Sequence, residues 1–534
     1  MSSKTVDFDV IVIGAGVAGM YMLHLLRKQG LSVRVFETGT GVGGTWYWNR
    51  YPGARFDSES YSYGYSFSKE LLQEWEWKEH FAPQPETLEY LNYVADKFDL
   101  RKDIQFETRV ESAHFQDADN CWEVTTDKFG SFRSTYVITA MGMLSAAFIP
   151  DFEGKEDFQG GSWHTSTWPK EAVDFSGKRV AVIGTGATAV QLIPEVGKQA
   201  GHMTVFQRTA NYVMPAGNSD ITAEEQAEIK AGYEQIFDRC KETFGAFLHD
   251  FDMRSALEVS DEEREAKFEE LYNARGFPIW LGNFHDILTD KKANATVTEF
   301  AQRKIRERII DPDNAEKLVP NDHMFGTKRV PLDHGYYETF DRDNVSLVDL
   351  NATPIDRITA TGIKTSEEEF EFDYIIYATG FDAITGAFKK VDIRGKDGEV
   401  LLEKWADGPR TFLGMQSAGF PNMFTITGPT NASTFCNLPR CIEQNVEWID
   451  ECIKYMQEND IQRIEATPEA ENEWTEHVNE TVEQTLLPET NSWFMGANIP
   501  GKKRTFLSYS GGSPLYRERC DTIAKEGYRG FVLS

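Results

Sequence analysis

The chain has 534 residues, 85 of them acidic and 55 basic, which gives a formal net charge of −30. This length suits about two to four domains, and the acidic excess argues against a surface that binds nucleic acid or an anionic membrane. The most apolar segment, residues 10–26, is interrupted by Gly14, Gly16, Gly19 and His24. It therefore predicts neither a membrane span nor a signal peptide.

The six cysteines contain no CxxC pair, so we expect neither a disulfide scaffold nor a zinc ribbon. A reducing cytoplasm is the expected compartment, and no metal site is predicted. Cys436 and Cys441 share the CxxxxC spacing of some flavin disulfide reductases, but they lie far from the first glycine-rich loop and enclose Pro439. We expect them to serve in packing rather than in redox chemistry.

The first dinucleotide-binding pattern covers residues 8–37. An apolar strand, Phe8–Ile13, leads into a glycine-rich loop that opens a helix over residues 17–29. Such a loop provides a tight turn and presents helix amides to a pyrophosphate. The next strand, residues 32–36, ends at Glu37, whose carboxylate is placed to accept hydrogen bonds from a ribose, and this favours FAD. The loop glycines are Gly14, Gly16 and Gly19.

The second pattern repeats the first with one change. The strand Arg179–Ile183 leads into a loop containing Gly184, Gly186 and Ala189. The following strand, His202–Gln207, ends in Arg208 and Thr209, where an acid would favour NAD. An arginine at this position can pair with a 2′-phosphate, so we expect NADPH. The alternative is an ordinary surface arginine.

Charge-dense helical sequence follows over residues 220–320. Ile229, Tyr233, Phe237 and Cys240 fall at helical spacing. We interpret this region as a helical insertion, and we expect its aromatic residues to pack in a core rather than to contact a cofactor.

Two strands that run into small turns mark crossings between domains. They are residues 136–142 and Tyr374–Tyr377, the latter leading into Ala378-Thr-Gly-Phe-Asp382. The predicted fold is therefore α/β, with two Rossmann-like dinucleotide-binding domains and a helical insertion. The expected divisions are an FAD-binding domain at 1–145 and 386–534, an NADPH-binding domain at 146–218 and 331–385, and the helical insertion at 219–330.

Between the two loops, residues 158–169 have the form FxGxxxHTxxWP, built from Phe158, Gly160, His164, Thr165, Trp168 and Pro169. This element resembles the signature of type I Baeyer–Villiger monooxygenases, flavoenzymes that use NADPH and O2 to turn ketones into esters or lactones through a C4a-peroxyflavin. The resemblance extends over essentially the whole chain. The stretch FGTKR at 325–329 looks closest to phenylacetone monooxygenase, whereas residues 430–439 mix features of that enzyme and of cyclohexanone monooxygenases.

The resemblance implies a role for each matched residue. Against the flavin would lie Thr45, Trp46, Asp57, Tyr63, the Val110 backbone and Leu438; against the NADP pyrophosphate, Thr185, Gly186, Thr188 and Gln191; against the 2′-phosphate, Arg208, Thr209 and Lys328; and against the nicotinamide ribose, Trp493. Arg329 would be the principal catalytic side chain, with Asp57 as its counter-ion. A guanidinium suits this role because it stays protonated while donating several hydrogen bonds to a developing anion.

The position of the signature element between the nucleotide domains suggests a structural or conformational role for His164, with direct proton transfer as the alternative. We interpret Thr165, Trp168 and Pro169 as hinge and packing residues.

Three other functions stay open. Heteroatom oxygenases of the flavin-containing monooxygenase type share both loops, but their signature usually lacks the Thr-x-x-Trp-Pro ending. A disulfide reductase would need a cysteine pair beside the first loop, and a non-catalytic flavoprotein would not need Asp57, Lys328 and Arg329 together. The expected partners are a small-molecule ketone and O2, with no nucleic acid, no membrane insertion and no obligatory protein partner.

Overall fold

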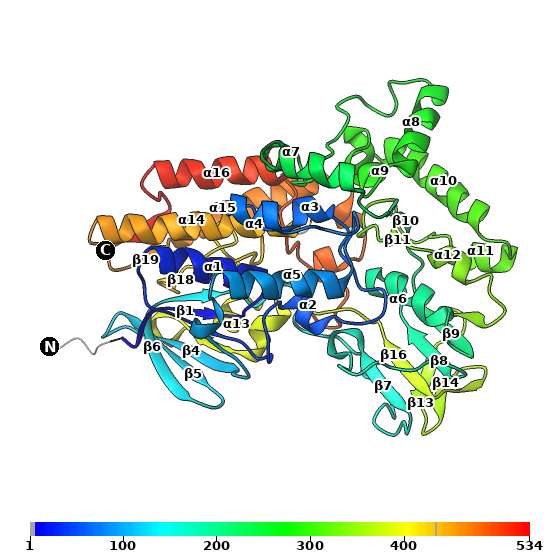
Figure 1. The fold of residues 1–534 in the computed structure, drawn as a ribbon, viewed down its shortest axis with the longest axis horizontal. Helices are drawn as coiled ribbons and strands as arrows, with labels where there is room; N and C mark the ends of the chain where they lie inside the picture. The colour runs from blue at the N-terminus through cyan, green and yellow to red at the C-terminus, as the bar shows by residue number, and fades with distance from the viewer. Residues whose placement is uncertain (1–5, 433–434) are drawn as a thin grey trace.

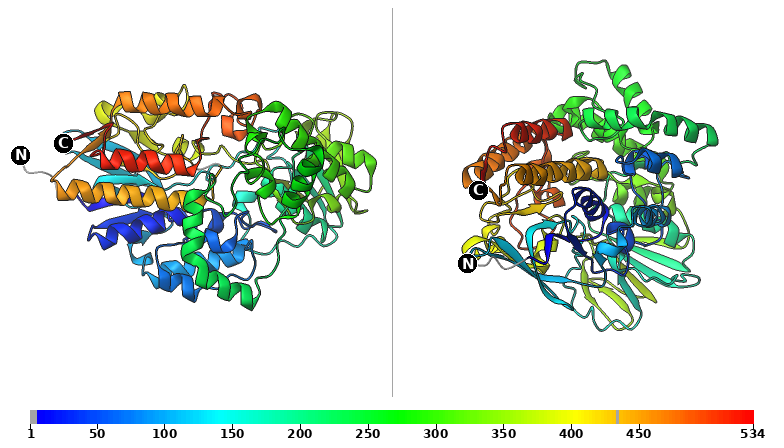
Figure 2. Two further views of the ribbon diagram at one scale, coloured as in Figure 1. Left: turned by 90° about the horizontal axis from the view of Figure 1, so that it is seen from above. Right: turned by 60° about the vertical axis from the view of Figure 1, so that its left-hand side comes forward.

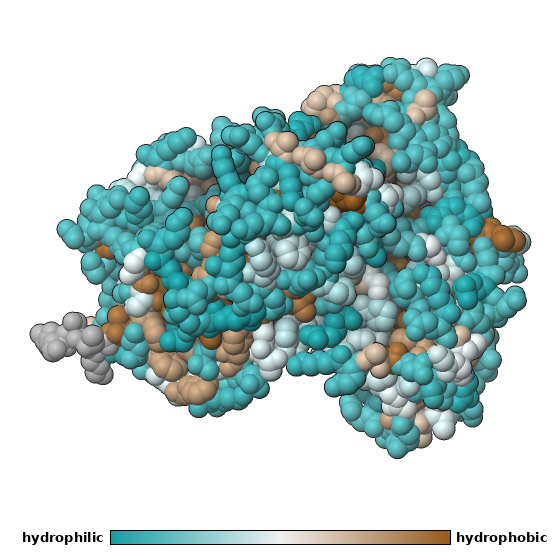
Figure 3. All heavy atoms as spheres, in the orientation of Figure 1, coloured by the Kyte–Doolittle hydropathy of each residue, from teal (hydrophilic) through white to brown (hydrophobic). Residues whose placement is uncertain are grey.

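Two β-sheets with parallel centres organise the chain (Figure 1). The structure is a computed structural model that describes residues 6–432 and 435–534. The larger sheet lies on one side of the molecule and the smaller on the other, and the surface is indented between them (Figure 3). The face in Figure 3 is mostly hydrophilic, as the high charge leads one to expect.

The larger sheet joins strands from both ends of the chain, in the order β17-β4-β5-β6-β1-β2-β3, with β18 paired to β6. At its centre β1 pairs in parallel with β2 and β6, so the first glycine-rich loop leaves the sheet between two buried neighbours. The strands are β1 (Phe8–Ile13), β2 (Val33–Phe36), β3 (Ile104–Gln105), β4 (Val110–Gln116), β5 (Cys121–Thr126), β6 (Gly130–Thr139), β17 (Asp392–Arg394) and β18 (Met423–Thr425).

Strand β6 starts earlier than the expected 136–142 because it has two partners. Its first half pairs antiparallel with β5, from Gly130 opposite Thr126, and its second half pairs in parallel with β1. Pairing with β5 extends the strand beyond its apolar part. Only the apolar part could be recognised as a strand from the sequence.

The smaller sheet has the order β12-β9-β8-β16-β7, and all its pairings are parallel. The central strands β8 and β16 are almost wholly apolar and buried, as expected for a sheet covered on both faces. The strands are β7 (Gly161–His164), β8 (Arg179–Ile183), β9 (His202–Gln207), β12 (Val345–Asp349) and β16 (Tyr374–Tyr377). A separate small sheet is formed by β13 (Ile355–Ile358), β14 (Gly362–Thr365) and β15 (Glu369–Glu371).

Helices cover the larger sheet in layers (Figures 1 and 2). Helix α1 (Val17–Lys28) follows the first loop and packs against α14 (Leu438–Glu458), which in turn packs against α16 (Ser513–Lys525). Helix α6 (Ala187–Gly197) follows the second loop in the same way. The remaining long helices outside the insertion are α5 (Gln84–Lys97) and α15 (Pro468–Glu483), and the short ones include α2 (Thr45–Trp48), α3 (Ser60–Tyr63), α4 (Lys69–Glu74), α12 (Tyr336–Thr339) and α13 (Leu401–Lys404).

The charge-dense region is helical, and its two ends are held together. Strands β10 (Met214–Pro215) and β11 (Leu332–Asp333) pair in parallel at the points where the chain leaves and re-enters. Helix α7 begins with a reciprocal capping box between Thr222 and Glu225. The helices of this charge-dense region are α7 (Ala223–Glu242), α8 (Asp261–Asn273), α9 (Pro278–Leu281), α10 (Lys291–Arg308) and α11 (Pro312–Leu318). Tyr233 and Phe237 are buried in a small apolar cluster with Leu72, which agrees with a packing role.

Cys436 and Cys441 form a disulfide, which the sequence did not lead us to expect. It joins the residue before the N-cap Asn437 to the first turn of α14. Cys121, Cys240, Cys452 and Cys520 are free and buried.

Within the described part of the chain, no helix is long and apolar enough to cross a membrane. The same residues contain no group of three or more histidine, cysteine or acidic side chains that could hold a metal ion.

Candidate active site

The first glycine-rich loop has the geometry of a dinucleotide-binding turn. Gly14 has a φ of +107°, and a Cβ there would lie 2.5 Å from the carbonyl oxygen of Ala140. The buried Glu37 carboxylate accepts the backbone N–H of Ala15 at 2.9 Å and that of Gly39 at 2.7 Å. Glu37 therefore holds the loop while it lies beside the amides that open α1, where the sequence places the ribose.

The second loop repeats this turn on the smaller sheet. Gly184 has a φ of +111°, and a Cβ there would lie 2.4 Å from the carbonyl oxygen of Ala378. A Cβ on Gly186 would meet nothing within 4 Å, so this position faces open space at the N-terminus of α6. Thr185 donates its hydroxyl to the carbonyl of Thr209 at 2.7 Å, which ties the loop to the end of β9.

Two cations from distant parts of the chain meet beside this loop. Burial lowers the pKa of Lys328, and the charge of Arg208 lowers it further. Asp322, whose carboxylate lies 3.5 Å from the Lys328 ammonium, acts in the opposite direction. Asn351 donates to the Arg208 carbonyl at 2.6 Å and fixes the backbone there. Since the two cations repel one another, a doubly charged phosphate between them would be stabilised.

Arg329 and Asp57 form the ion pair that the sequence predicted. The guanidinium donates to Asp57 Oδ2 at 2.6 Å, with the aspartate side chain 5% exposed and that of arginine 35% exposed. Burial raises the pKa of Asp57, and the Arg329 charge opposes that shift. The ring of Phe277 lies 5.5 Å from the guanidinium carbon, so an aromatic face supports the arginine.

Gln191 connects this ion pair to the second loop. From α6 its amide donates to the Arg55 carbonyl at 2.9 Å and to Asp57 Oδ1 at 3.4 Å, and its carbonyl oxygen accepts the Tyr51 hydroxyl at 2.8 Å. The Thr188 hydroxyl lies beside the same tyrosine. Helix α6 thus contacts the arginine's counter-ion directly.

Tyr51 and Phe277 were not expected in this group, and Gln191 was expected only at the pyrophosphate. Tyr51 lies in the matched stretch at 51–57, which could have indicated it. Phe277 is in the helical insertion, where no spacing marks it. Phe277 contacts the Arg329 guanidinium, a role that the expectation of core packing did not include.

Aromatic side chains form the next part of the site. The Trp46 indole donates to the Tyr63 hydroxyl at 3.0 Å, and Tyr63 stacks on Phe56 with ring centroids 4.1 Å apart. Thr45 is exposed at the start of α2. Val110 is not part of this aromatic group, because it starts β4 opposite Thr126.

Leu438 and Trp493 come together from different elements. Both pack on one apolar cluster, that of Met143, Ala383, Ile384 and Leu507. This cluster joins the start of α14 to the short helix η7 (Trp493–Met495).

His164 is held by both of its ring nitrogens. Nδ1 accepts the Ser166 N–H at 3.1 Å, and Nε2 lies 3.0 Å from the Gly380 carbonyl, to which it donates in the neutral tautomer. Burial lowers the pKa of His164 to about 4. The ring therefore joins the signature element to the second crossing between domains, and no nitrogen is left for proton transfer. Trp168, also buried, packs near Trp163 and Phe175.

Similarity to known proteins identifies the family of this chain. Residues 8–221 match the model of the flavin-binding monooxygenase-like family. A 2-oxo-Δ3-4,5,5-trimethylcyclopentenylacetyl-CoA monooxygenase of Pseudomonas putida is 47% identical, covering 100% of this chain and 99% of its own. A Baeyer–Villiger monooxygenase of Pseudooceanicola batsensis is 44% identical, covering 99% and 97%.

The chain belongs to the Baeyer–Villiger monooxygenases. Its fold agrees: the crystal structure of OTEMO in complex with FAD and NADP superposes with a TM-score of 0.97 at 47% identity, covering 99% of this chain and 100% of the other. Family membership confirms the predicted α/β fold, the enzyme class and the pair of cofactors, FAD and NADPH. A phenazine N-monooxygenase of Lysobacter antibioticus is also similar, 44% identical over 98% of this chain and 97% of its own.

Proposed function

We propose that this enzyme oxidises ketones to esters or lactones at the Arg329–Asp57 pair, using NADPH and O2. The observation that carries the proposal is the 2.6 Å ion pair between a half-exposed arginine and a buried aspartate. It supplies a fixed positive charge at the place where the aromatic group, helix α6 and the insertion meet.

The residues present fit both cofactors. The glycine turns leave no room for a Cβ at Gly14 or Gly184, whereas Gly186 faces open space that a pyrophosphate can approach. When bound, the reduced flavin supplies the electrons that activate O2, and the nicotinamide supplies those that reduce the flavin. We assign the flavin contacts to Thr45, Trp46, Tyr63, Val110 and Leu438, and the NADP contacts to Thr185, Thr188, Gln191, Arg208, Thr209, Lys328 and Trp493.

Arg329 acts as an electrostatic donor. A guanidinium keeps its proton, so it stabilises negative charge on oxygen without neutralising it by proton transfer. Asp57 holds the guanidinium in one direction, and the Phe277 ring limits the water that reaches it. Since Gln191 binds Asp57 from α6, movement of the NADPH-binding unit is transmitted to the orientation of Arg329.

The domain boundaries belong to the same proposal. We place the FAD-binding domain at 1–145 and 386–534, the NADPH-binding domain at 146–218 and 331–385, and the helical insertion at 219–330. Every strand of the larger sheet falls in the first of these and every strand of the smaller sheet in the second. We place the enzyme in the cytoplasm, working on a small ketone without an obligatory protein partner.

Heteroatom oxidation is the second candidate. It is favoured by the similarity to the phenazine N-monooxygenase, which by name acts on nitrogen. The two reactions need opposite polarity at the substrate. A ketone carbon is attacked by a nucleophilic oxygen, whereas an amine or sulfide attacks an electrophilic one. A guanidinium that stabilises negative charge on oxygen supports the ketone reaction, which needs the nucleophilic form.

Product analysis under 18O2 tests the proposal. The holoenzyme is incubated with NADPH and a panel of linear, cyclic and aryl ketones, together with a sulfide and a tertiary amine. We expect esters or lactones that carry one 18O atom. Oxidation of the sulfide and amine alone would replace this function with heteroatom oxygenation, and NADPH consumption without any oxygenated product would reject both.

A further inference from the structure

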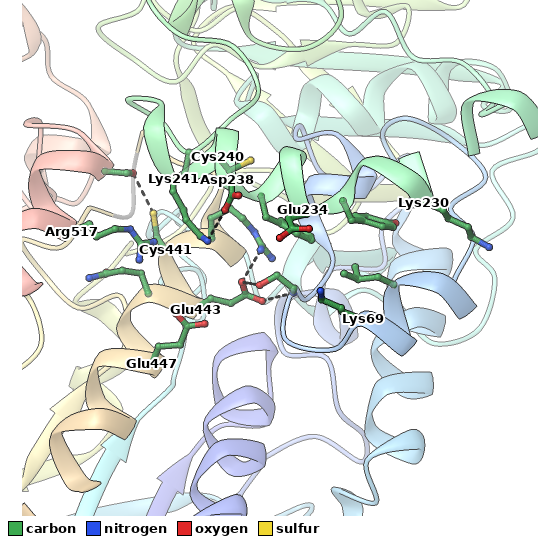
Figure 4. A pocket seen from close by; sticks show the side chains of 18 of the residues that line it. Lys69, Lys230, Glu234, Asp238, Cys240, Lys241, Cys441, Glu443, Glu447 and Arg517 are labelled. Atoms are coloured by element: carbon green, nitrogen blue, oxygen red, sulfur yellow. Dashed lines mark hydrogen bonds and ion pairs between the residues drawn. The ribbon is translucent and has the colours of Figure 1, made fainter. Parts of the chain in front are cut away.

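A cavity lies away from Arg329 and Asp57, between helices α4, α7, α14 and α16. Its volume is about 510 Å³, in the range of small-molecule sites. Figure 4 shows Lys69 and Arg517 on opposite sides of it, with Glu443 and Cys441 between them. All four helices contribute lining residues, so the cavity lies within the helical layer that covers the larger sheet.

A buried donor without an acceptor lies in its α14 wall. The Arg440 side chain is 6% exposed; it donates to Glu443 at 2.7 Å and to the Gly64 carbonyl, yet its Nε–H has no partner among the described residues. One turn further along α14 the buried Gln444 amide contacts the Cys520 thiol, so Arg440 Nε is the donor that a ligand would serve. An unpaired buried donor costs about 1–3 kcal/mol, so a ligand that supplies an acceptor is favoured here.

The charges around the cavity favour an anion. Neither Lys69 nor Arg517 forms an ion pair with a described residue, although both line the cavity. The carboxylates are already occupied: Glu443 by Arg440 and both donors of Ser66, and Asp238 by Lys241 at 3.0 Å.

Two further carboxylates line the cavity, Glu447 and Glu234, and they do not cancel the preference for an anion. Glu447 accepts the Tyr21 hydroxyl at 3.0 Å, and it faces the positive charges of Arg440 and Arg517, which offset its own. Glu234 is exposed on the α7 side, toward Lys230 rather than Arg517 (Figure 4).

One part of the wall, on the α7 side, is apolar and aromatic. Tyr233 and Phe237 stack with centroids 5.7 Å apart, and Leu72 packs beside them. The Arg440 guanidinium lies 4.6 Å above the Phe237 ring, so the cationic and the aromatic parts of the wall adjoin. A ligand that satisfies both parts has a carboxylate at one end and a ring or short hydrocarbon body at the other.

We infer that this cavity is a binding site for a small organic carboxylate with a cyclic apolar body. The site is separate from the proposed catalytic centre but shares an element with it, because the same first turns of α14 carry Leu438 and Arg440. Asn437, which precedes them, donates to the Ser62 carbonyl at 3.1 Å, next to Tyr63 of the aromatic group. An occupant therefore contacts the helix end on which part of the flavin side is built.

Calorimetric titration of the FAD-bound enzyme with benzoate tests the inference. We expect a dissociation constant below about 1 mM, which corresponds to about −4 kcal/mol. Benzamide, which has the same ring without the charge, should bind at least about tenfold more weakly, because a charged acceptor bonds more strongly than a neutral one. Inorganic phosphate should also bind more weakly, since it leaves the aromatic wall uncovered. Phosphate binding as tight as that of benzoate would overturn the organic class of ligand.

Three variants separate this site from Arg329, which also attracts anions. Arg517→Ala and Lys69→Ala should each weaken benzoate binding about fivefold. Arg440→Lys, which keeps the charge but removes the Nε donor, should weaken it about tenfold. Lys454→Ala, at an exposed position further along α14, removes the same charge and should change nothing.

If Arg440→Lys does not fold, Arg517→Ala and Lys69→Ala still test the inference. Absence of binding to the wild type, or binding that Arg517→Ala and Lys69→Ala leave unchanged, overturns the inference. Flavin content and thermal midpoint serve as folding controls for each variant.

Discussion

At the scale of single residues, the proposed chemistry depends on charges that are fixed by burial. Asp57 is almost inaccessible to solvent, and it is held by Gln191 as well as by Arg329. Arg329 is more exposed, as required of a group that must reach a substrate. The asymmetry makes Asp57 the anchor and Arg329 the working side chain.

Cofactor discrimination also belongs to this scale. Lys328→Ala should lower kcat/KM for NADPH by about 10- to 150-fold, the equivalent of a lost charged hydrogen bond of about 1.5–3 kcal/mol, and should leave that for NADH nearly unchanged. Steady-state kinetics with both cofactors measures this. Lys198→Ala, which breaks only the surface pair with Glu195, is the matched control. An equal loss with NADH would remove Lys328 from phosphate recognition.

At the scale of elements, the second glycine-rich loop contains two different requirements. Gly184 has a backbone that other residues rarely adopt and a carbonyl in the way of a Cβ, whereas Gly186 has an ordinary extended backbone and open space. The first glycine therefore serves the fold and the second serves the ligand.

Alanine at the two positions should separate these roles. Gly184→Ala should lower the thermal midpoint or prevent folding, because strain and overlap together cost several kcal/mol. Gly186→Ala should fold and retain FAD but lose NADPH affinity, since the added methyl group stands where a pyrophosphate approaches. Thermal unfolding and NADP+ titration measure the two effects. Tight NADP+ binding by Gly186→Ala would show that the pyrophosphate lies elsewhere.

The elements themselves could largely be predicted from the sequence. Strands β1, β8 and β9 have the bounds expected, because short apolar runs ending at a glycine loop or a charged residue define them locally. Helix α1 ends one residue earlier than expected. The pairing of β18 with β6 could not be foreseen, because it joins residues almost 300 positions apart and depends on tertiary packing.

Of the candidate site, only the residues that lie in a recognisable motif could be predicted. Asp57, Lys328 and Arg329 lie in matched stretches, and the ion pair was expected. The contact of Gln191 with Asp57 and the support of Arg329 by Phe277 were not, since nothing in local sequence reports which helix faces which domain. The Cys436–Cys441 disulfide was not expected, because the spacing of two cysteines does not report the backbone conformation between them.

At the scale of the whole molecule, buried neutral histidines couple stability to pH. Burial lowers the pKa of His24, His164 and His249 to about 4. In the unfolded chain a histidine titrates near pH 6.5. The folded state thus binds fewer protons, so the stability from these residues is complete above about pH 6.5 and is lost as the pH falls toward 4.

The holoenzyme should therefore have a lower urea midpoint at pH 5.5 than at pH 7.5, although protonation reduces its large negative charge. His164 alone can account for about 3 kcal/mol over the full range. His164→Gln should make the dependence on pH less steep. A midpoint that rises as the pH falls would show that relief of charge repulsion dominates.

The central claim is that Arg329 serves oxygen transfer rather than folding or flavin reduction. The direct test is to measure ester, hydrogen peroxide and NADPH consumed in the same reaction for Arg329→Ala. Arg306→Ala serves as a control, because the Arg306 guanidinium pairs with Glu316 at 2.7 Å on the surface of the insertion. We predict that Arg329→Ala binds FAD and still oxidises NADPH, while ester formation falls about 100- to 1,000-fold and hydrogen peroxide replaces it, because one preorganised charged donor is worth about 3–4 kcal/mol. Ester formed per NADPH at the wild-type ratio would contradict the account and place the catalytic charge elsewhere.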